Sequence, residues 1–345
     1  MCFRRAAFRH EENANDINKL IEFFEECHAQ NSQFRWEVKL DHEGVLHSLF
    51  WSHASMQGEY IDFGDVITFD TTHKTNMYDK PLALFVGANH HLQNTIFGCA
   101  LLGDETIPTF EWVFQAFKKC MGKMRTRCIL TGDWNIRLER VQILTCSCLF
   151  GHNASLDIAM TLLVFFFPAD QDKAMEVALA KVLPDIIHRI CRWHVVNKVT
   201  SSLNELYVLH ERRNFKGKFQ SVLNHPLTPG EFEAAWKDLI REFDLHNHPS
   251  MESLYQQRRN FIPAYFKKDY CGRMTSTQRS ESTNYILKKG FVDKGNALHR
   301  FAKNIMNFMH SRLMKEAEET YLSTVKYNLK FRCVRHNSSS ITLTV

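Results

Sequence analysis

Three β-type segments follow one another closely in the first third of the chain, and they limit the fold more than any other feature. They are Val66–Thr72 (VITFDTT), Leu82–His90 (LALFVGANH) and Thr95–Leu102 (TIFGCALL). The connecting sequences NMYDKP and HLQN are rich in residues that favour turns. Strands so closely spaced predict an antiparallel group at the start of a sheet.

The rest of the chain alternates between helical and strand-like patterns. Before the three segments we expect a helix carrying Ile17 to Cys27, a hairpin of 34–41 and 45–51 and a short helix at 52–60. After them we expect a helix at 107–121, a strand at 127–131, a helix at 172–183 and a strand leading into a helix at 185–194. The remainder is predicted to be helical, with helices throughout 198–268, a helix at 276–289 and another at 297–321. This order predicts an α/β fold with a mixed sheet.

Composition places the chain among ordinary globular proteins. Apolar residues make up 44% and charged residues 23% of the sequence, and the formal net charge is +5. This weak basic excess is compatible with nucleic acid as a partner but does not establish it. The longest apolar run, Ile158–Phe167, is much shorter than the roughly 20 residues that span a bilayer, so no membrane is expected. Ten scattered cysteines and a start without a secretory pattern favour a reducing compartment.

Several acidic residues occur at positions that suit metal-dependent phosphodiester chemistry. Such chemistry needs carboxylates that converge from separate elements onto two cations. Asp70 lies within the first β-type segment, Asp170 and Asp172 open a helix after the fourth strand, and Glu281 lies on a later helix. Asp170 or Asp172 alone is equally explained as a helix cap, and Glu281 as a solvated helix residue.

Four motifs taken together are more specific. FGDVITFDTTHKTNMYDKPLALFVGANHHLQNTIFGCALLGDET, DQDKAM, HRICRWHV and MTSTQRSESTN occur in this order. The chain resembles, from about residue 14 to about residue 325, the far-red-impaired-response family of plants, whose members derive from Mutator-like element (MULE) transposases. The resemblance implies a ribonuclease-H-like core with an all-helical insertion before the last acid. It also implies that Asp70, Asp170 and Glu281 are the catalytic acids, which hold Mg²⁺ or Mn²⁺ in active transposases of this type.

The resemblance implies a domain organisation and a function. We expect an N-terminal helix and hairpin (1–60), the transposase core (61–197), the helical insertion (198–270), the last core helices (271–325) and a tail (326–345). The resemblance implies a nuclear transcription regulator that acts through DNA or protein partners, with a homo- or heterodimer as one option. This is the expected function. The alternatives are an active metal-dependent transposase with a DDE acid triad and a non-functional fragment of a degenerate gene.

The CRWH sequence supplies Cys191 and His194, which match the family's Cys-x-x-His signature. They either organise packing beside the acids or bind Zn²⁺, although a structural zinc site needs four ligands. Full-length relatives begin with a zinc-finger-type module, and many end with a Cys/His module; neither pattern is found in this sequence. We therefore expect a transposase core without its DNA-reading module.

The segment 132–169 interrupts the family pattern. Its removal would join Ile129–Thr131 directly to Asp170 and restore ILTDQDKAM. Our hypothesis is that this segment is a translated intron. The alternative is a loop insertion that carries Cys146 and Cys148 as metal ligands.

A basic cluster in the helical insertion is the candidate nucleic-acid contact. It consists of Arg212, Arg213, Lys216 and Lys218, with Phe215 interleaved. A solvated helix face explains the same pattern.

Overall fold

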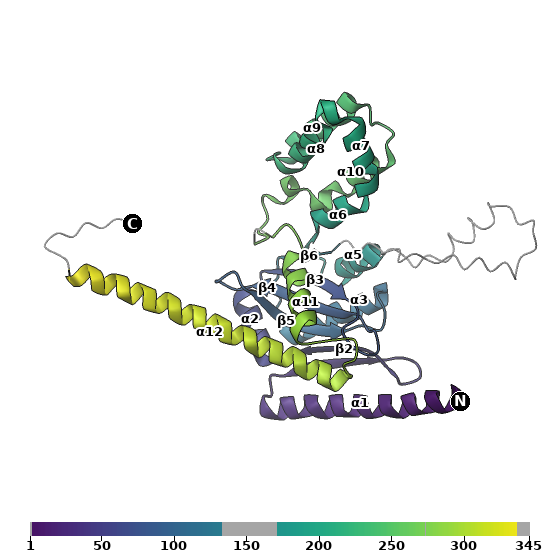
Figure 1. Cartoon of the computed structure of the whole chain (residues 1–345), viewed down its shortest axis with the longest axis vertical. Coiled ribbons are helices and arrows are strands. Elements are labelled where there is room, and N and C mark those ends of the chain that lie inside the picture. The colour runs from purple at the N-terminus through teal and green to yellow at the C-terminus, as the bar shows by residue number, and fades with distance from the viewer. Residues whose placement is uncertain (1, 133–170, 273, 337–345) are drawn as a thin grey trace, which may run out of the picture.

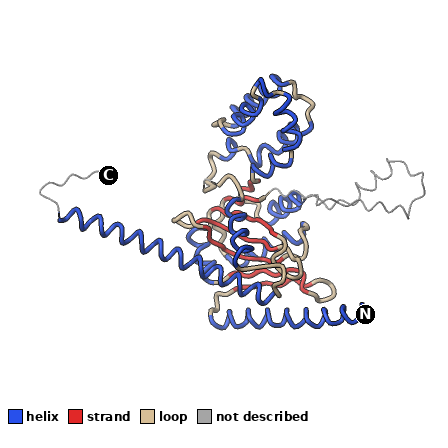
Figure 2. The backbone as a smooth tube through the Cα atoms, in the orientation of Figure 1, coloured by secondary structure: helices blue, strands red, loops and turns tan. Residues whose placement is uncertain are grey.

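The sheet of the protein has seven strands in the order β1-β2-β5-β4-β3-β6-β7 among the residues that the computed structural model describes, 2–132, 171–272 and 274–336. The strands are β1 (Arg35–Leu40), β2 (Leu46–Ser52), β3 (Val66–Thr72), β4 (Leu82–Ala88), β5 (Asn94–Leu101), β6 (Cys128–Thr131) and β7 (Ile187–Ile190). All pairings from β1 to β3 are antiparallel, whereas β3, β6 and β7 run parallel. The predicted α/β fold with a mixed sheet is confirmed (Figure 2).

The parallel strands end at the same edge of the sheet. Phe69 of β3 pairs with Thr131 of β6, which in turn pairs with Ile190 of β7. Asp70 directly follows Phe69, and Cys191 directly follows Ile190. The register therefore aligns Asp70 and Cys191 across the end of β6, at the point where the sheet changes from antiparallel to parallel. Such switch points are where α/β sheets place their ligands.

Helices cover both faces of the sheet. On one face lie α2 (Ala54–Phe63), α3 (Ile107–Met121) and α5 (Gln171–Val182), and an aromatic core joins them to the strands. The rings of Phe85 in β4 and Phe117 in α3 stack there with centroids 4.1 Å apart. The apolar spacing that predicted the helix at 107–121 is thus the spacing of its buried face.

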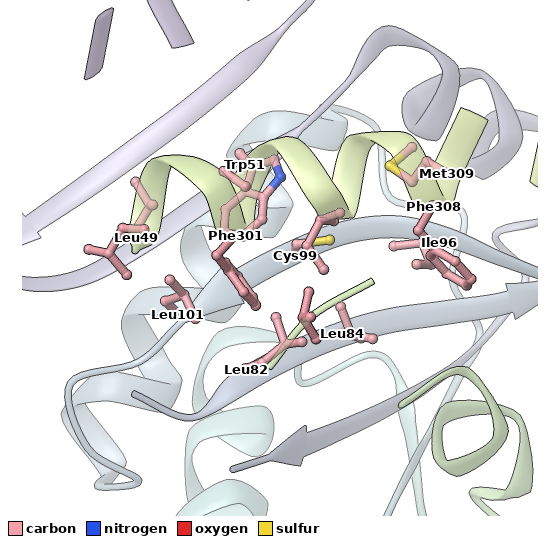
Figure 3. Packing of buried hydrophobic residues seen from close by; sticks show 14 of the residues in the cluster. Leu49, Trp51, Leu82, Leu84, Ile96, Cys99, Leu101, Phe301, Phe308 and Met309 are labelled. Carbon is pink, nitrogen blue, oxygen red and sulfur yellow. The ribbon is translucent and has the colours of Figure 1, made fainter. Parts of the chain in front are cut away.

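The other face is covered by α1 (Cys2–Gln30) and α12 (Leu298–His336). Phe301, Phe308 and Met309 of α12 pack against the strands (Figure 3). The helix α12 continues beyond the predicted end at 321 and extends away from the sheet (Figure 1). No helix among the described residues has the length and apolar character needed to cross a bilayer.

One carboxylate joins the two helices of this face. Asp16 of α1 is 6% exposed and accepts hydrogen bonds from the backbone N–H groups of Leu298 and His299, the His299 Nδ1 and the Tyr78 hydroxyl, at 2.6, 3.2, 2.6 and 3.0 Å. It therefore acts as the N-terminal cap of α12 from a distant part of the chain.

A close approach inside the sheet requires a glycine. The ring of Phe97 in β5 lies directly over Gly87 of β4, where an added Cβ would come within 2.3 Å of the ring. The strand β4 ends at Ala88, two residues before the predicted end at His90. The reason is a turn that Asn89 closes, because its side chain accepts hydrogen bonds from the N–H groups of His91 and Gln93.

The helical insertion forms a lobe with its own core, shown in teal and green in Figure 1. Its helices are α6 (Arg192–Lys198), α7 (Thr200–Leu209), α8 (Phe215–Asn224), α9 (Pro229–Phe243) and α10 (Pro249–Phe261), with 3₁₀ turns at Glu211–Arg213 and Pro263–Phe266. Trp236 is 5% exposed within this core. The chain then returns to the sheet as α11 (Gln278–Gly290).

Candidate active site

The centre of the candidate site is Asp70. It occupies the fifth position of the central strand β3 and is 2% exposed. Burial, and secondarily the negative charge of Glu281, raise the pKa of Asp70 to about 8. Its Oδ2 accepts a hydrogen bond from Asn284 Nδ2 at 3.4 Å, whereas its buried Oδ1 has no hydrogen-bond partner among the described residues. A buried carboxylate oxygen without a partner is costly unless a proton or a cation satisfies it.

Glu281 approaches from α11, which packs on β3. Ser280 of this helix donates a hydrogen bond to Thr68 of β3 at 2.7 Å and fixes the helix on the strand. Glu281 Oε1 accepts a hydrogen bond from the Thr277 hydroxyl at 2.9 Å. The side chain of Glu281 remains 45% exposed, so this carboxylate is open to solvent while Asp70 is enclosed.

Cys191 and His194 lie beside the two acids. His194 Nε2 is 3.7 Å from Glu281 Oε1, and its Nδ1 is 3.4 Å from the Thr277 hydroxyl. Burial alone would raise the pKa of Cys191, but hydrogen bonding to His194 and Thr277 outweighs burial and lowers this pKa to about 7. Burial works against protonation of His194, but the Cys191 sulfur and the nearby carboxylates raise its pKa. The Cys-x-x-His pair therefore forms one hydrogen-bonded group with the end of α11.

The structure thus brings together four residues that the sequence singled out: Asp70, Cys191, His194 and Glu281. The fifth, Asp170, lies outside the described residues, as does the segment 133–169 with its two cysteines. The described chain leaves β6 at Gly132 and resumes with α5 at Gln171. The catalytic role of the three acids stays a prediction.

Two contacts of the site were not predicted from the sequence. Thr277 links His194 to Glu281, and Asn284 holds one oxygen of Asp70. Both lie within MTSTQRSESTN at spacings of four and three residues from Glu281. Such spacings place them on the same side of the helix as Glu281, which was the available signal.

The donor atoms fit a hard cation better than zinc. Asp70 and Glu281 offer carboxylate oxygens, the ligand type that Mg²⁺ and Mn²⁺ prefer, and the Oδ1 of Asp70, which has no hydrogen-bond partner in the described part of the chain, is suited to such an ion. Within the described residues, no group of three or more His, Cys, Asp or Glu side chains is arranged to hold a metal. Cys191 and His194 supply two of the four ligands that a structural zinc site needs.

The predicted nucleic-acid cluster makes several contacts within the insertion. Arg213 donates to the backbone oxygen of Glu242, Lys218 pairs with the carboxylate of the same residue, and the Lys216 Nζ lies 5.5 Å from the ring centroid of Tyr207. Arg212 is exposed. These contacts are those of a helix face that faces solvent, and DNA binding by the cluster stays a prediction.

The sequence of the chain is similar to those of known proteins. Residues 66–135, which contain β3 with Asp70 and extend through β6, match the MULE transposase domain. The predicted relationship is confirmed: the chain is related to the MULE-derived, FAR1-related proteins of plants.

The individual relatives come from Arabidopsis thaliana. The chain is 28% identical to Protein FAR-RED IMPAIRED RESPONSE 1 over 88% of its length, 26% identical to Protein FAR1-RELATED SEQUENCE 5 over 89%, and 27% identical to Protein FAR1-RELATED SEQUENCE 4 over 90%. The matched regions make up 32%, 34% and 37% of those proteins. The chain therefore spans about a third of the length of these relatives.

Proposed function

We propose that this chain is a transposase-derived nuclear protein of the far-red-impaired-response type that regulates transcription through DNA or protein partners. The likeness to FAR-RED IMPAIRED RESPONSE 1 along 88% of the chain supports this proposal. The observation that carries the DNA-binding part is the acid pair: Asp70 and Glu281 come from β3 and α11, far apart in sequence, and meet at the switch point of the sheet. A site of this kind holds cations, and through them phosphate groups.

We further propose that the strands β5, β4, β3, β6 and β7 form a ribonuclease-H-like core. The support is their arrangement, with three antiparallel strands followed by two parallel ones and with the first acid on the central strand. The position of Glu281 on a helix that follows a long helical insertion agrees with the same interpretation. The hairpin of β1 and β2 extends this core at the β5 edge.

A second candidate function is metal-dependent cleavage and strand transfer of DNA. It is favoured by the buried Oδ1 of Asp70, which has no hydrogen-bond partner among the described residues and which a cation would satisfy. Asp70, Asp170 and Glu281 would hold Mg²⁺ or Mn²⁺. Such ions activate an attacking oxygen and stabilise the leaving oxygen of a phosphodiester.

The two functions separate in one experiment. The protein is incubated with an end-labelled duplex in the presence of Mg²⁺ or Mn²⁺, and binding and cleavage are recorded together. The variants are Asp70→Asn and, as a matched control, Asp62→Asn, which alters an exposed acid on α2. Cleavage that is lost only in Asp70→Asn identifies a transposase-type enzyme. Binding without cleavage, weakened in Asp70→Asn but not in Asp62→Asn, identifies a regulator that holds DNA through the acid pair.

Nuclear action and the segment 132–169 need separate tests. A fluorescent fusion of the full chain in plant cells should accumulate in the nucleus; an even distribution through the cell would contradict the nuclear part of the proposal. Sequencing of the transcript across codons 132–169 decides whether this segment is a translated intron. A continuous message that encodes it as the major form would defeat the intron hypothesis.

A further inference from the structure

Trp193 is an exposed aromatic side chain in contact with His194 of the candidate site. It is 59% exposed, and its ring lies 4.8 Å from the ring of His194, in an edge-on orientation of 77°. His194 in turn lies 3.7 Å from Glu281. A large apolar ring held in solvent beside a polar site is characteristic of a binding surface.

The short helix α6 holds Trp193 in this position. Cys191 at the start of the helix and Val195 four residues later are 0% and 2% exposed, and both face inward. Trp193 lies between them in sequence and therefore faces outward. The backbone N–H of Cys191 is also bonded to Thr131 of β6 at 2.9 Å, so the sheet itself fixes the start of the helix.

A polar groove follows the beginning of α11. It is lined by Asn94, Gly272, Thr275, Ser276, Gln278 and Arg279, among others. Arg279 donates hydrogen bonds to the Leu92 carbonyl and to Asn94 Oδ1, at 3.0 and 2.9 Å, and so joins the groove to the β4–β5 turn. Thr277 lies in the middle of this segment and contacts His194. Trp193 is therefore joined to the acid pair through His194, whereas the groove lies on another face of α11, with Gln278 and Arg279.

We propose that Trp193 is a stacking surface for an unpaired nucleobase next to the phosphodiester held at the acid pair. The inference rests on the proposed DNA-binding function. Nucleobases stack on aromatic rings whatever their sequence, because every base presents a π-face. An unpaired base has lost its stacking neighbours in the duplex, and an exposed indole beside the acid pair can replace them.

The test compares two fluorescein-labelled duplexes of the same sequence, one fully paired and one with a single unpaired thymine, by fluorescence anisotropy in Ca²⁺. The variants are Trp193→Ala, Trp193→Phe and Tyr321→Ala, the last being a control that removes an exposed aromatic ring (67%) on α12. We expect Trp193→Ala to weaken binding of the unpaired duplex about tenfold or more. Trp193→Phe retains most of the affinity, Tyr321→Ala matches the unaltered protein, and the fully paired duplex is affected much less.

The outcomes separate the inference from the proposal on which it rests. Because Trp193 is exposed, circular dichroism and thermal unfolding of Trp193→Ala should match those of the unaltered protein. Equal affinity of Trp193→Ala and the unaltered protein for the unpaired duplex would overturn the inference and assign the indole to a protein contact, while DNA binding would stand. Failure of the unaltered protein to bind either duplex would overturn both.

Discussion

Replacement of Asp70 by Asn should stabilise the folded protein, and the gain should grow with pH. The pKa of Asp70 is about 8 in the folded state because the carboxyl is buried and faces Glu281, whereas an unperturbed aspartate ionises near 3.8. Below about pH 3.8 both the folded and the unfolded states are protonated, and this carboxyl contributes no pH dependence. Between 3.8 and 8 the unfolded state loses the proton and the folded state keeps it, so stability falls as pH rises.

The size of the effect follows from the interval between the two pKa values. Each pH unit within that interval costs the folded state about 1.4 kcal/mol. An asparagine at position 70 has nearly the same shape but cannot ionise. We therefore expect the free energy of unfolding of Asp70→Asn to exceed that of the unaltered protein by a margin that widens by about 4 kcal/mol between pH 5 and pH 9.

Urea denaturation monitored by circular dichroism at several pH values measures this margin. Asp62→Asn, which alters an exposed acid, should show no such widening. Saturating Mn²⁺ at pH 8 should stabilise the unaltered protein by about 3 kcal/mol at a hundredfold excess over its Kd, but not Asp70→Asn. A margin that stays constant from pH 5 to pH 9 would refute the assignment of Asp70 as a buried, protonated carboxyl.

Three further outcomes are expected. Asp16→Ala removes the acceptor of four hydrogen bonds, three of them from Leu298 and His299 at the start of α12. It should lower the free energy of unfolding, measured by urea denaturation, by about 2–4 kcal/mol. A loss below about 0.5 kcal/mol would contradict the capping role. His194→Gln should raise the pKa of Cys191 from about 7 towards the ordinary value of 9.0, seen as an upward shift in the pH midpoint of the thiolate ultraviolet absorbance with Cys191→Ser as the blank, and an unchanged midpoint would exclude the pairing. Gly87→Ala should destabilise the protein by about 1–3 kcal/mol because its Cβ meets the Phe97 ring, whereas Gly58→Ala, with open space around it, should not.

Much of the local structure could be predicted because single elements carry their own periodic signals. The helix at 107–121 has its predicted bounds, and the strands at 66–72 and 128–131 lie within one residue of theirs. The ends that moved depend on specific contacts: β4 stops at Ala88 because of the turn that Asn89 closes. Periodicity does not encode such a side-chain turn.

The candidate site was predictable only in part, for a physical reason. The resemblance to known relatives indicated which acids to compare, but the ionisation of Asp70 depends on how completely the sheet and α11 enclose it. The partners of Asp70 and His194, Asn284 and Thr277, lie 214 and 83 residues away from them in the chain. The sequence alone does not place such distant side chains against one another.

The two ends of the helical lobe meet beside the acid pair. The chain leaves the sheet after Ile190 and returns to it with α11. His194 and Thr277, close to these two points, are in contact although 83 positions separate them. An inserted segment whose two ends are in contact can change in length or sequence with little disturbance to the sheet from which it extends. A change in the length or sequence of this lobe should therefore leave Asp70 and Glu281 in place at the edge of the sheet.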